Sequence, residues 1–248
     1  MQQKNVFNQF QKFLKETNGE FHILEKQIPV EIQFEYFKFS DQLKKTPLPV
    51  EDDDLEKFTF DLENPESTKE YKKELLSTLA TSKQVKAYRI LEQYVKNPDP
   101  ELTDWAYMAL MESRITLESE LSEEKQIYIS TGLGGKGQKL RFFILLLSST
   151  NKPFLDYQRK VIEREFEYAL SKQNCEIESL TVKETHVEIL VLMPIRLDIK
   201  KAIEDVIQEC NQYGNFLSGL FTVTNMKVLG SDEIAEIVNS HLQKLTEE

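Results

Sequence analysis

The sequence is poor in cysteine, in long apolar runs and in net positive charge, and each scarcity excludes a class of protein. Two cysteines, Cys175 and Cys210, are too few for a disulfide framework and match no metal-ligand spacing, so we expect free buried thiols. The longest run of purely aliphatic and aromatic residues, 142–147, is far shorter than the ~18 residues of a membrane span. A formal net charge of −11 argues against a protein that coats nucleic acid non-specifically.

Enough apolar residues are present to build substantial cores. The chain has 248 residues, of which 40% are hydrophobic and 15 are phenylalanine, so we expect one large domain or two small ones. Its first residues, MQQKNVFNQFQKFLKE, lack the apolar segment of a signal peptide. We therefore expect a cytoplasmic protein with no membrane partner.

Residues 1–124 predict an all-α amino-terminal domain. Helices are predicted at 68–79, 83–96 and 101–121, and a further helix is favoured over a strand after Pro29. The acidic block at 51–54 follows two prolines and is expected in a solvated loop. The segment YRILEQYVKNPDPELTDWAYMAL resembles one HEAT-type helical repeat, a unit that usually presents a binding surface.

Residues 125–248 predict a sheet domain. Strands are predicted at 138–148, 176–184, 186–194 and 220–229, and helices at 154–172, 197–211 and 231–245. The order β-α-β-β-α-β predicts a ferredoxin-like antiparallel sheet with helices on one face, so the whole chain is expected to be α+β. A strand at 127–132 would add an edge. The glycines of GLGGKG suit a hairpin turn, whereas a phosphate-binding loop would precede a helix.

A histidine and a carboxylate begin the strand at 186–194. Alternate side chains of a strand share a face, so His186 and Glu188 are expected to be neighbours. His186 also has a simpler interpretation, a hydrogen-bonded histidine at the start of a strand. His241 has no partner that is visible in the sequence and is expected at the surface.

Three stretches of the second half resemble one known family. FILLLSSTNKPFL, NCEIESLTVKETHVEILVLMPIRLDIKKAIEDVI and FTVTNMKVLGSDEIAEIV are similar, in the same order, to the HUH single-tyrosine transposase-like domain of insertion sequences and REP-associated proteins. The resemblance covers residues 138–245. In that family two histidines flanking an apolar residue bind a divalent metal, and a tyrosine of the last helix attacks the DNA phosphate.

The chain departs from the family pattern in both catalytic parts. His186 and Val187 match the first histidine and the apolar residue, but Glu188 replaces the second histidine. Because glutamate still ligates Mg²⁺ or Mn²⁺, the resemblance implies a metal site at His186 and Glu188, and no other cofactor is predicted. No tyrosine follows Tyr213. The resemblance therefore implies a catalytically degenerate domain without a predicted catalytic residue.

Basic residues concentrate between Lys136 and Arg164, where seven basic residues accompany two acidic ones. In the family the corresponding edge contacts hairpin DNA. We predict phosphate contacts to structured DNA or RNA from Lys136, Lys139, Arg141, Lys152, Arg159 and Lys160. Ordinary solvent-facing charges are the alternative.

Three functions stay open at this point. The leading hypothesis is a non-catalytic nucleic-acid-binding protein. The second is an adaptor without a nucleic-acid ligand, with a protein partner bound through the helical domain. The third is a residual metal-dependent DNA-processing enzyme that uses His186 and Glu188. The sequence does not decide the ligand, the oligomeric state (a dimer included) or the cellular process.

Overall fold

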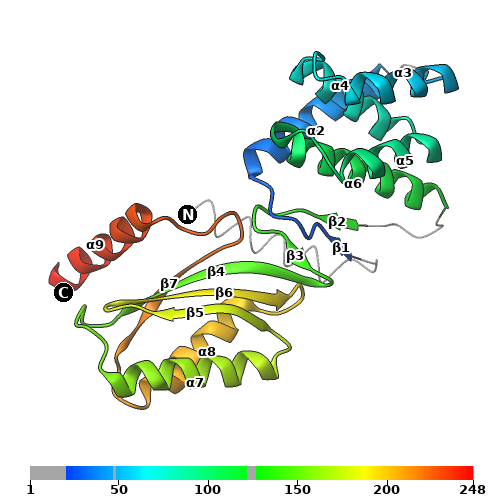
Figure 1. Ribbon diagram of the computed structural model, residues 1–248. Helices are drawn as coiled ribbons and strands as arrows, with labels where there is room; N and C mark the ends of the chain where they lie inside the picture. Colours follow the sequence, from blue (N-terminus) through cyan, green and yellow to red (C-terminus); the bar gives the residue numbers. More distant parts are fainter. Residues whose placement is uncertain (1–20, 47–48, 122–126, 248) are drawn as a thin grey trace. The chain divides into compact units, whose positions relative to one another are not determined.

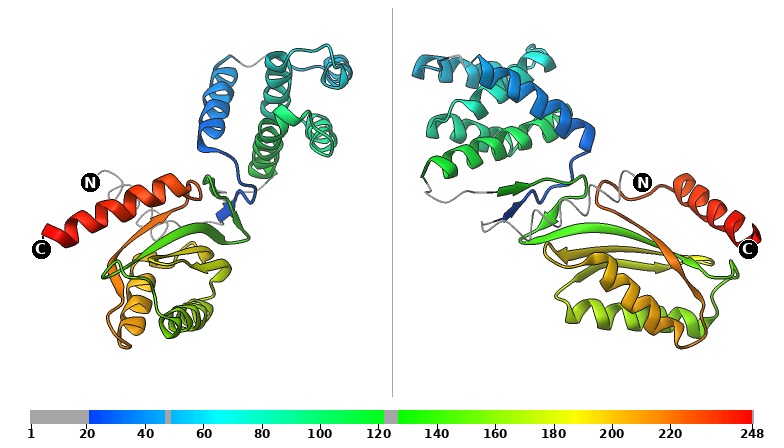
Figure 2. Two further views of the ribbon diagram at one scale, coloured as in Figure 1. Left: turned by 60° about the vertical axis from the view of Figure 1, so that its left-hand side comes forward. Right: turned by 180° about the vertical axis from the view of Figure 1, so that it is seen from behind.

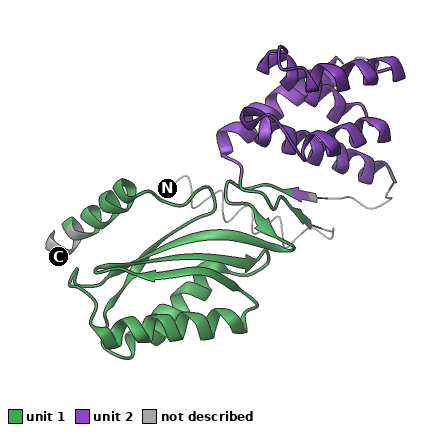
Figure 3. Cartoon of the chain, in the orientation of Figure 1, with its two compact units in different colours: residues 1–18, 22–27, 129–248 green, residues 19–21, 28–128 purple. Residues whose placement is uncertain are grey.

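The computed structural model describes residues 21–46, 49–121 and 127–247, which combine helices with antiparallel sheet (Figure 1). The α+β class is therefore confirmed. The chain divides into two compact units (Figure 3). The helical unit holds the described part of 19–21 and 28–128, and the sheet unit holds the described part of 22–27 and 129–248. The predicted boundary between residues 124 and 125 lies outside the described residues. Within them, no helix has the length and apolar character to cross a membrane.

Local sequence signals set the helices of the helical unit. It contains α2 (Val30–Lys45), α3 (Asp52–Glu63), α4 (Lys69–Thr81), α5 (Val85–Tyr94), the 3₁₀ turn η1 (Pro100–Leu102) and α6 (Thr103–Leu121). Pro29 precedes α2, and the hydroxyl of Thr68 accepts a hydrogen bond from the backbone N–H of Tyr71 at 3.3 Å to begin α4. The predicted helices of this half are present, including the one after Pro29.

The acidic block is helical, so the loop predicted at 51–54 is wrong. α3 begins at Asp52, and the carboxylate of Asp54 accepts a hydrogen bond from the backbone N–H of Glu51 at 2.9 Å. Three aspartates in the first turn also interact favourably with the positive end of the helix dipole. The acids that suggested a solvated loop therefore begin a helix.

A buried carboxylate joins α2 to α6 inside the helical unit. Glu112 accepts hydrogen bonds from the hydroxyls of Tyr36 and Ser40, each at 2.6 Å, and its other contact is an ion pair with Lys44 at 2.6 Å. Burial, and then the neighbouring charge of Glu112, raise the pKa of Tyr36 well above 10. These donors satisfy a charge that would otherwise be buried without a partner.

The sheet unit is organised around its longest strand, β4. Its elements are β3 (Gly135–Lys136), β4 (Lys139–Ser148), α7 (Asp156–Lys172), β5 (Glu176–Val182), β6 (His186–Pro194), α8 (Ile199–Asn211), β7 (Leu217–Thr224) and α9 (Ser231–Glu247). The strands lie in the order β7-β4-β6-β5, with β3 beside the first residues of β4, and each pair is antiparallel. This register places Leu147 opposite His186 and Leu145 opposite Glu188.

Helices cover both faces of this sheet, which corrects the expectation that they lie on one face. α7 and α8 pack on one side and α9 on the other (Figures 1 and 2). Phe143, Leu145 and Leu147 form a buried cluster with Ile234 of α9. The residues between them on β4 point to the opposite face, toward α7 and α8. β4 is apolar from Phe142 to Leu147, where both of its faces are buried.

Residues 127–132 do not form the predicted extra edge of the large sheet. β2 (Ile127–Ile129) pairs instead with β1 (Phe21–Ile23) in a separate two-stranded sheet. The additional edge strand is β3, which a two-residue turn joins to β4. Gly137 in that turn has a φ of +57°, a conformation that glycine adopts easily. The glycine-rich segment is therefore a hairpin turn.

Candidate functional site

His186 and Glu188 lie side by side at the start of β6. They share one face of the strand, and Nε2 of His186 is 3.2 Å from Oε1 of Glu188. Their side chains are 20% and 28% exposed, so solvent reaches both. The two residues are therefore neighbours as expected, while metal binding by them stays a prediction.

α9 covers this pair and forms a cleft of about 370 Å³ with it. The sheet side is lined by Lys183, Thr185, His186 and Glu188, and the α9 side by Ser231, Ile234, Ala235, Val238 and Asn239. Sequence reasoning missed Lys183 and Thr185. The available signal was their position in the short connection between two predicted strands, directly before His186.

The His186–Glu188 pair offers two of the ligands that Mg²⁺ or Mn²⁺ needs, one nitrogen and one carboxylate. In the described part of the chain, no group of three His, Cys, Asp or Glu side chains could hold a metal ion. A cation at this pair would complete its coordination with water or with phosphate oxygens. Two ligands alone do not make a metal site, so metal binding by this pair stays a prediction.

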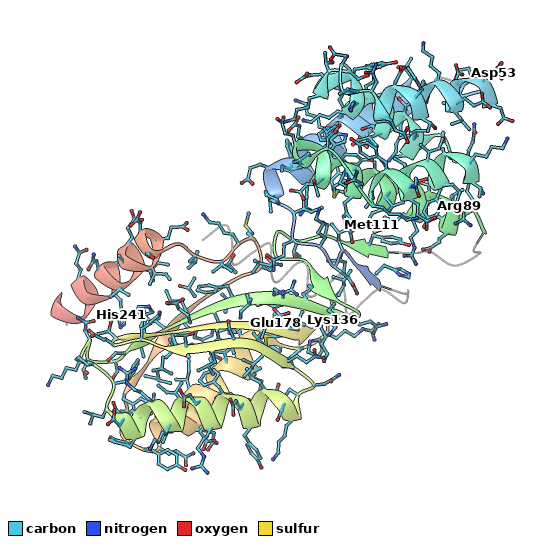
Figure 4. The ribbon with its side chains drawn as sticks, viewed as in Figure 1. Asp53, Arg89, Met111, Lys136, Glu178 and His241 are labelled. Carbon is cyan, nitrogen blue, oxygen red and sulfur yellow. The ribbon has the colours of Figure 1, made fainter. Side chains whose placement is uncertain are left out.

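His241 is buried, although the sequence suggested a surface position (Figure 4). It is 9% exposed, and neither ring nitrogen has a hydrogen-bond partner among the described residues. His241 follows Ile234 by seven residues and Val238 by three, so the three side chains share the sheet-facing side of α9. It does not line the cleft described above, and it is no third ligand for the His186–Glu188 pair.

The six predicted phosphate-binding residues form two separate groups. Lys136, Lys139 and Arg141 lie on β3 and the start of β4, whereas Lys152, Arg159 and Lys160 follow the end of β4. β4 has ten residues and is about 33 Å long at 3.3 Å per residue. The two groups therefore lie at opposite ends of the sheet and do not form one phosphate cluster.

Carboxylates of β5 neutralise the first group. Arg141 makes a two-point ion pair with Glu178, with Nε–Oε2 at 2.5 Å and Nη2–Oε1 at 2.8 Å, which raises the pKa of Arg141. Lys139 pairs with Glu176 and lowers the pKa of that carboxyl, and Lys136 lies 4.0 Å from the same group. Figure 4 labels Lys136 and Glu178 in this region. A phosphate would have to compete with these carboxylates.

The second group lies at the same end of the sheet as the cleft. Two backbone hydrogen bonds tie the loop after β4 to the turn between β5 and β6. Ser148 N–H donates to the carbonyl of Thr185, and Phe154 N–H donates to the carbonyl of Glu184, each at 2.8 Å. Because Thr185 also lines the cleft, the loop after β4 is held beside it.

The cations of this second group differ in their availability. Arg159 donates to the carbonyl of Val182 at 2.7 Å and so braces the β5 end. Lys152 and Lys160 are exposed and take part in no ion pair with another described residue. Lys183, which lines the cleft, is exposed in the same way. The structure therefore adds Lys183 to the cations at this end.

Comparisons with known proteins give slight similarities. No protein-family model matches the chain, and no curated protein matches it. One similar solved structure is a protein of Deinococcus radiodurans R1 provisionally named a transposase, with 13% identity, a TM-score of 0.34, and coverage of 43% of this chain and 90% of that one. Another is a REP-associated tyrosine transposase bound to a REP hairpin, with 12% identity, a TM-score of 0.33, and coverage of 51% and 73%. Similarity at this level assigns neither a function nor a ligand to the chain.

Proposed function

We propose that the sheet unit is a ferredoxin-like, transposase-derived domain that binds structured DNA or RNA through phosphate contacts and does not cut it. The strand order β7-β4-β6-β5, with α7 and α8 as connecting helices, supports the ferredoxin-like assignment. The resemblance of residues 138–245 to the HUH single-tyrosine family supports the ancestry. We also propose that the helical unit is HEAT-like, because α5 and α6 form a helical pair around the NPDP turn.

The residues that α9 presents to the cleft support binding without cleavage. The polar side chains it contributes there are Ser231 and Asn239, and the sequence has no tyrosine after Tyr213. A serine hydroxyl needs an adjacent base to become a nucleophile. His186, the histidine of this cleft, is hydrogen-bonded to Glu188 on its own strand, and in the described part of the chain no hydrogen bond joins His186 to Ser231.

The observation that carries the proposal is a set of exposed lysines at the end of the sheet where the cleft lies, although Lys160, on α7, is across the sheet from the cleft itself. Lys152, Lys160 and Lys183 are exposed without an ion pair to any described residue. The chain as a whole carries −11, so distant charges repel a polyanion. At physiological salt those charges are screened beyond about 8 Å, and the lysines next to the ligand then dominate. We expect Lys136, Lys139 and Arg141 to contribute less to phosphate binding, because carboxylates of β5 already pair with them.

A salt titration with matched charge reversals tests this proposal. The probe is a fluorescently labelled DNA or RNA hairpin, and its anisotropy is followed over a range of salt concentrations. The variants are Lys152→Glu, Lys160→Glu and Lys183→Glu. The control is Lys201→Glu, the same change of charge at an exposed position of α8.

A plot of log K against log salt has a negative slope. Each lost phosphate contact should reduce the magnitude of that slope by about 0.7 to 0.9. We expect this for the three lysines and not for Lys201. Hairpin binding that is absent, insensitive to salt, or weakened equally by Lys201→Glu would overturn the proposal.

A second candidate function is favoured by the surface of the helical unit. Phe34, Phe37 and Phe60 are 72%, 46% and 70% exposed, more than packing inside the unit requires. Such residues suit a protein partner. If the chain is an adaptor, a stable partner recovered with the wild-type protein should be lost with Phe34→Ser and retained with Lys201→Glu. A partner that survives Phe34→Ser, or that nuclease treatment removes, would count against the adaptor.

A further inference from the structure

The outward face of α7 carries aromatic and basic residues that the fold does not require. We call them the α7 stripe: Tyr157, Lys160, Arg164, Tyr168 and Lys172, which are all exposed. Tyr157 is 50% and Tyr168 59% exposed. A surface helix normally presents polar residues to solvent, so two tyrosines there call for a separate explanation.

The helical period separates the stripe from the buried face. Ile162, Phe166 and Leu170 are fully buried, and they recur at intervals of four. Tyr157, Arg164 and Tyr168 are spaced by seven and four residues and therefore share a face opposite to them. Figure 1 shows α7 on the outer side of the sheet unit, where this opposite face meets solvent.

Acidic residues of α7 adjoin the cations of the stripe. Four acidic and four basic residues make the helix neutral overall, but the acids (Asp156, Glu163, Glu165 and Glu167) lie beside the stripe and not within it. Elsewhere such neighbours pair along a helix, as Arg114 does with Glu118 at 2.8 Å and Lys200 with Glu204 at 3.3 Å. Lys160 and Arg164 form no such pair with a described residue. Their cations therefore stay available to a ligand.

The aromatic surface extends past the start of α7. The hydroxyl of Tyr157 lies 3.5 Å from the position that a Cβ on Gly214 would take. Tyr213, the residue before Gly214, is 57% exposed. At the other end of the stripe, Nζ of Lys172 lies 4.0 Å from the centre of the Tyr168 ring and also donates to the hydroxyl of Tyr168, which is 59% exposed. Aromatic rings and cations thus lie together on this surface.

We propose that the α7 stripe binds single-stranded nucleic acid, with bases stacked on Tyr157 and Tyr168 and phosphates paired with Lys160 and Arg164. Every base has a π face, so stacking on exposed rings needs no particular sequence. Tyr157 and Tyr168 are eleven residues apart, about 16 Å along the helix axis, a distance that a short unpaired strand of a few nucleotides can span. This proposal rests on the proposed function, in which the sheet unit binds a hairpin. It adds that an unpaired strand next to the hairpin contacts the α7 stripe.

Three labelled probes separate this inference from the proposed function: a blunt hairpin, the same hairpin with an unpaired flank, and the single strand (dT)15. The variants are Tyr157→Ser, Tyr168→Ser and the two corresponding phenylalanine variants. Phe60→Ser, which removes an exposed ring of the helical unit, is the control. Each affinity is measured by anisotropy at one fixed salt concentration.

We expect each serine variant to weaken binding of (dT)15 and of the flank by roughly five-fold to a hundred-fold. Phenylalanine should restore the affinity, and the blunt hairpin should bind all variants equally. Two results would overturn the proposed role of the α7 stripe: no binding of (dT)15 by the wild-type chain, or equal binding of (dT)15 by the wild-type chain, Tyr157→Ser and Tyr168→Ser. Failure of the blunt hairpin alone would instead overturn the proposed function.

Discussion

Arg141 is either part of a structural ion pair or a contact to nucleic acid, and replacing it by alanine tests which role it has. Its guanidinium is held at two points by Glu178 of β5 and donates to the carbonyl of Leu133 at 2.6 Å. The side chain is 12% exposed and that of Glu178 is 31% exposed. We expect Arg141→Ala to destabilise the sheet unit and to leave the salt dependence of hairpin binding nearly unchanged.

The contacts of Arg141 set the size of the effect. A hydrogen bond to a charged group contributes about 1.5 to 3 kcal/mol when it is shielded, and an exposed ion pair contributes about 0 to 1 kcal/mol. The Arg141–Glu178 pair lies between these limits. The loss on replacing Arg141 is therefore about 1 to 2 kcal/mol, which raises the open population of the sheet unit by roughly 5- to 30-fold.

A buried thiol reports this opening without interference from the helical unit. Cys210 is fully buried on α8, and burial raises the pKa of its thiol to about 12. It should therefore react with an alkylating reagent only when the sheet unit opens. In a Cys175→Ser background, Arg141→Ala should increase the alkylation rate of Cys210 by roughly 5- to 30-fold. Lys200→Ala, which removes an exposed pair with Glu204, is the control and should change the rate less than about 3-fold.

A double-mutant cycle with Glu178→Ala completes the test, because the pair should show a coupling of about 1 kcal/mol. An unchanged alkylation rate would refute the structural role. If Arg141→Ala reduces the magnitude of the slope of log K against log salt for hairpin binding by about one, Arg141 contacts phosphate.

Three further predictions concern other parts of the molecule. With Mn²⁺ present, the wild-type chain should leave labelled hairpins intact on a denaturing gel; cleavage that disappears in His186→Ala would identify a residual enzyme. The hydrogen bond from buried Lys72 lowers the pKa of Asp99 below its usual 3.8. The Lys72–Asp99 pair therefore stabilises the helical unit fully above pH 3.8, and this stabilisation is lost as the pH falls through the lowered pKa of Asp99. Unfolding followed by the fluorescence of Trp105 should report this loss as the pH falls below about 4, and Lys72→Met should flatten it. Tyr36→Phe removes a donor to Glu112 and should destabilise the helical unit by about 1 to 3 kcal/mol; an unchanged denaturation midpoint would contradict that role.

Local patterns predicted the elements whose signals are complete within a few residues. β6 has the bounds His186–Pro194 because its apolar run ends at a proline, and α9 begins at Ser231 because a serine and two acids form its first turn. α3 was missed because the same acids that favour a helix start are also typical of a solvated loop. The deciding interaction there is the hydrogen bond from Glu51 to Asp54.

Long-range pairing accounts for what the sequence could not predict. Periodicity identifies the apolar side of α9 but not the face of the sheet that it covers, because both faces are apolar around β4. The neutralisation of Lys139 and Arg141 depends on the register of β5, which shifts between Ile177 and Ser179 at an irregularity. A shift of one residue in a strand moves a side chain to the other face, so the partners of these cations were not readable from spacing alone.

Under the proposed function, binding and cutting would depend on different segments of the sheet unit. The lysines proposed to contact phosphate belong to the loop after β4, to α7 and to the turn before β6, and backbone hydrogen bonds at Ser148 and Phe154 fix that loop and turn against each other. The position of a nucleophile, in contrast, depends on which side chains α9 directs into the cleft. Replacing a tyrosine on α9 by a small or polar residue would change the chemistry and leave the phosphate contacts in place. If the proposed function holds, a chain with Ser231, Ala235 and Asn239 along the cleft would keep the phosphate contacts without the nucleophile.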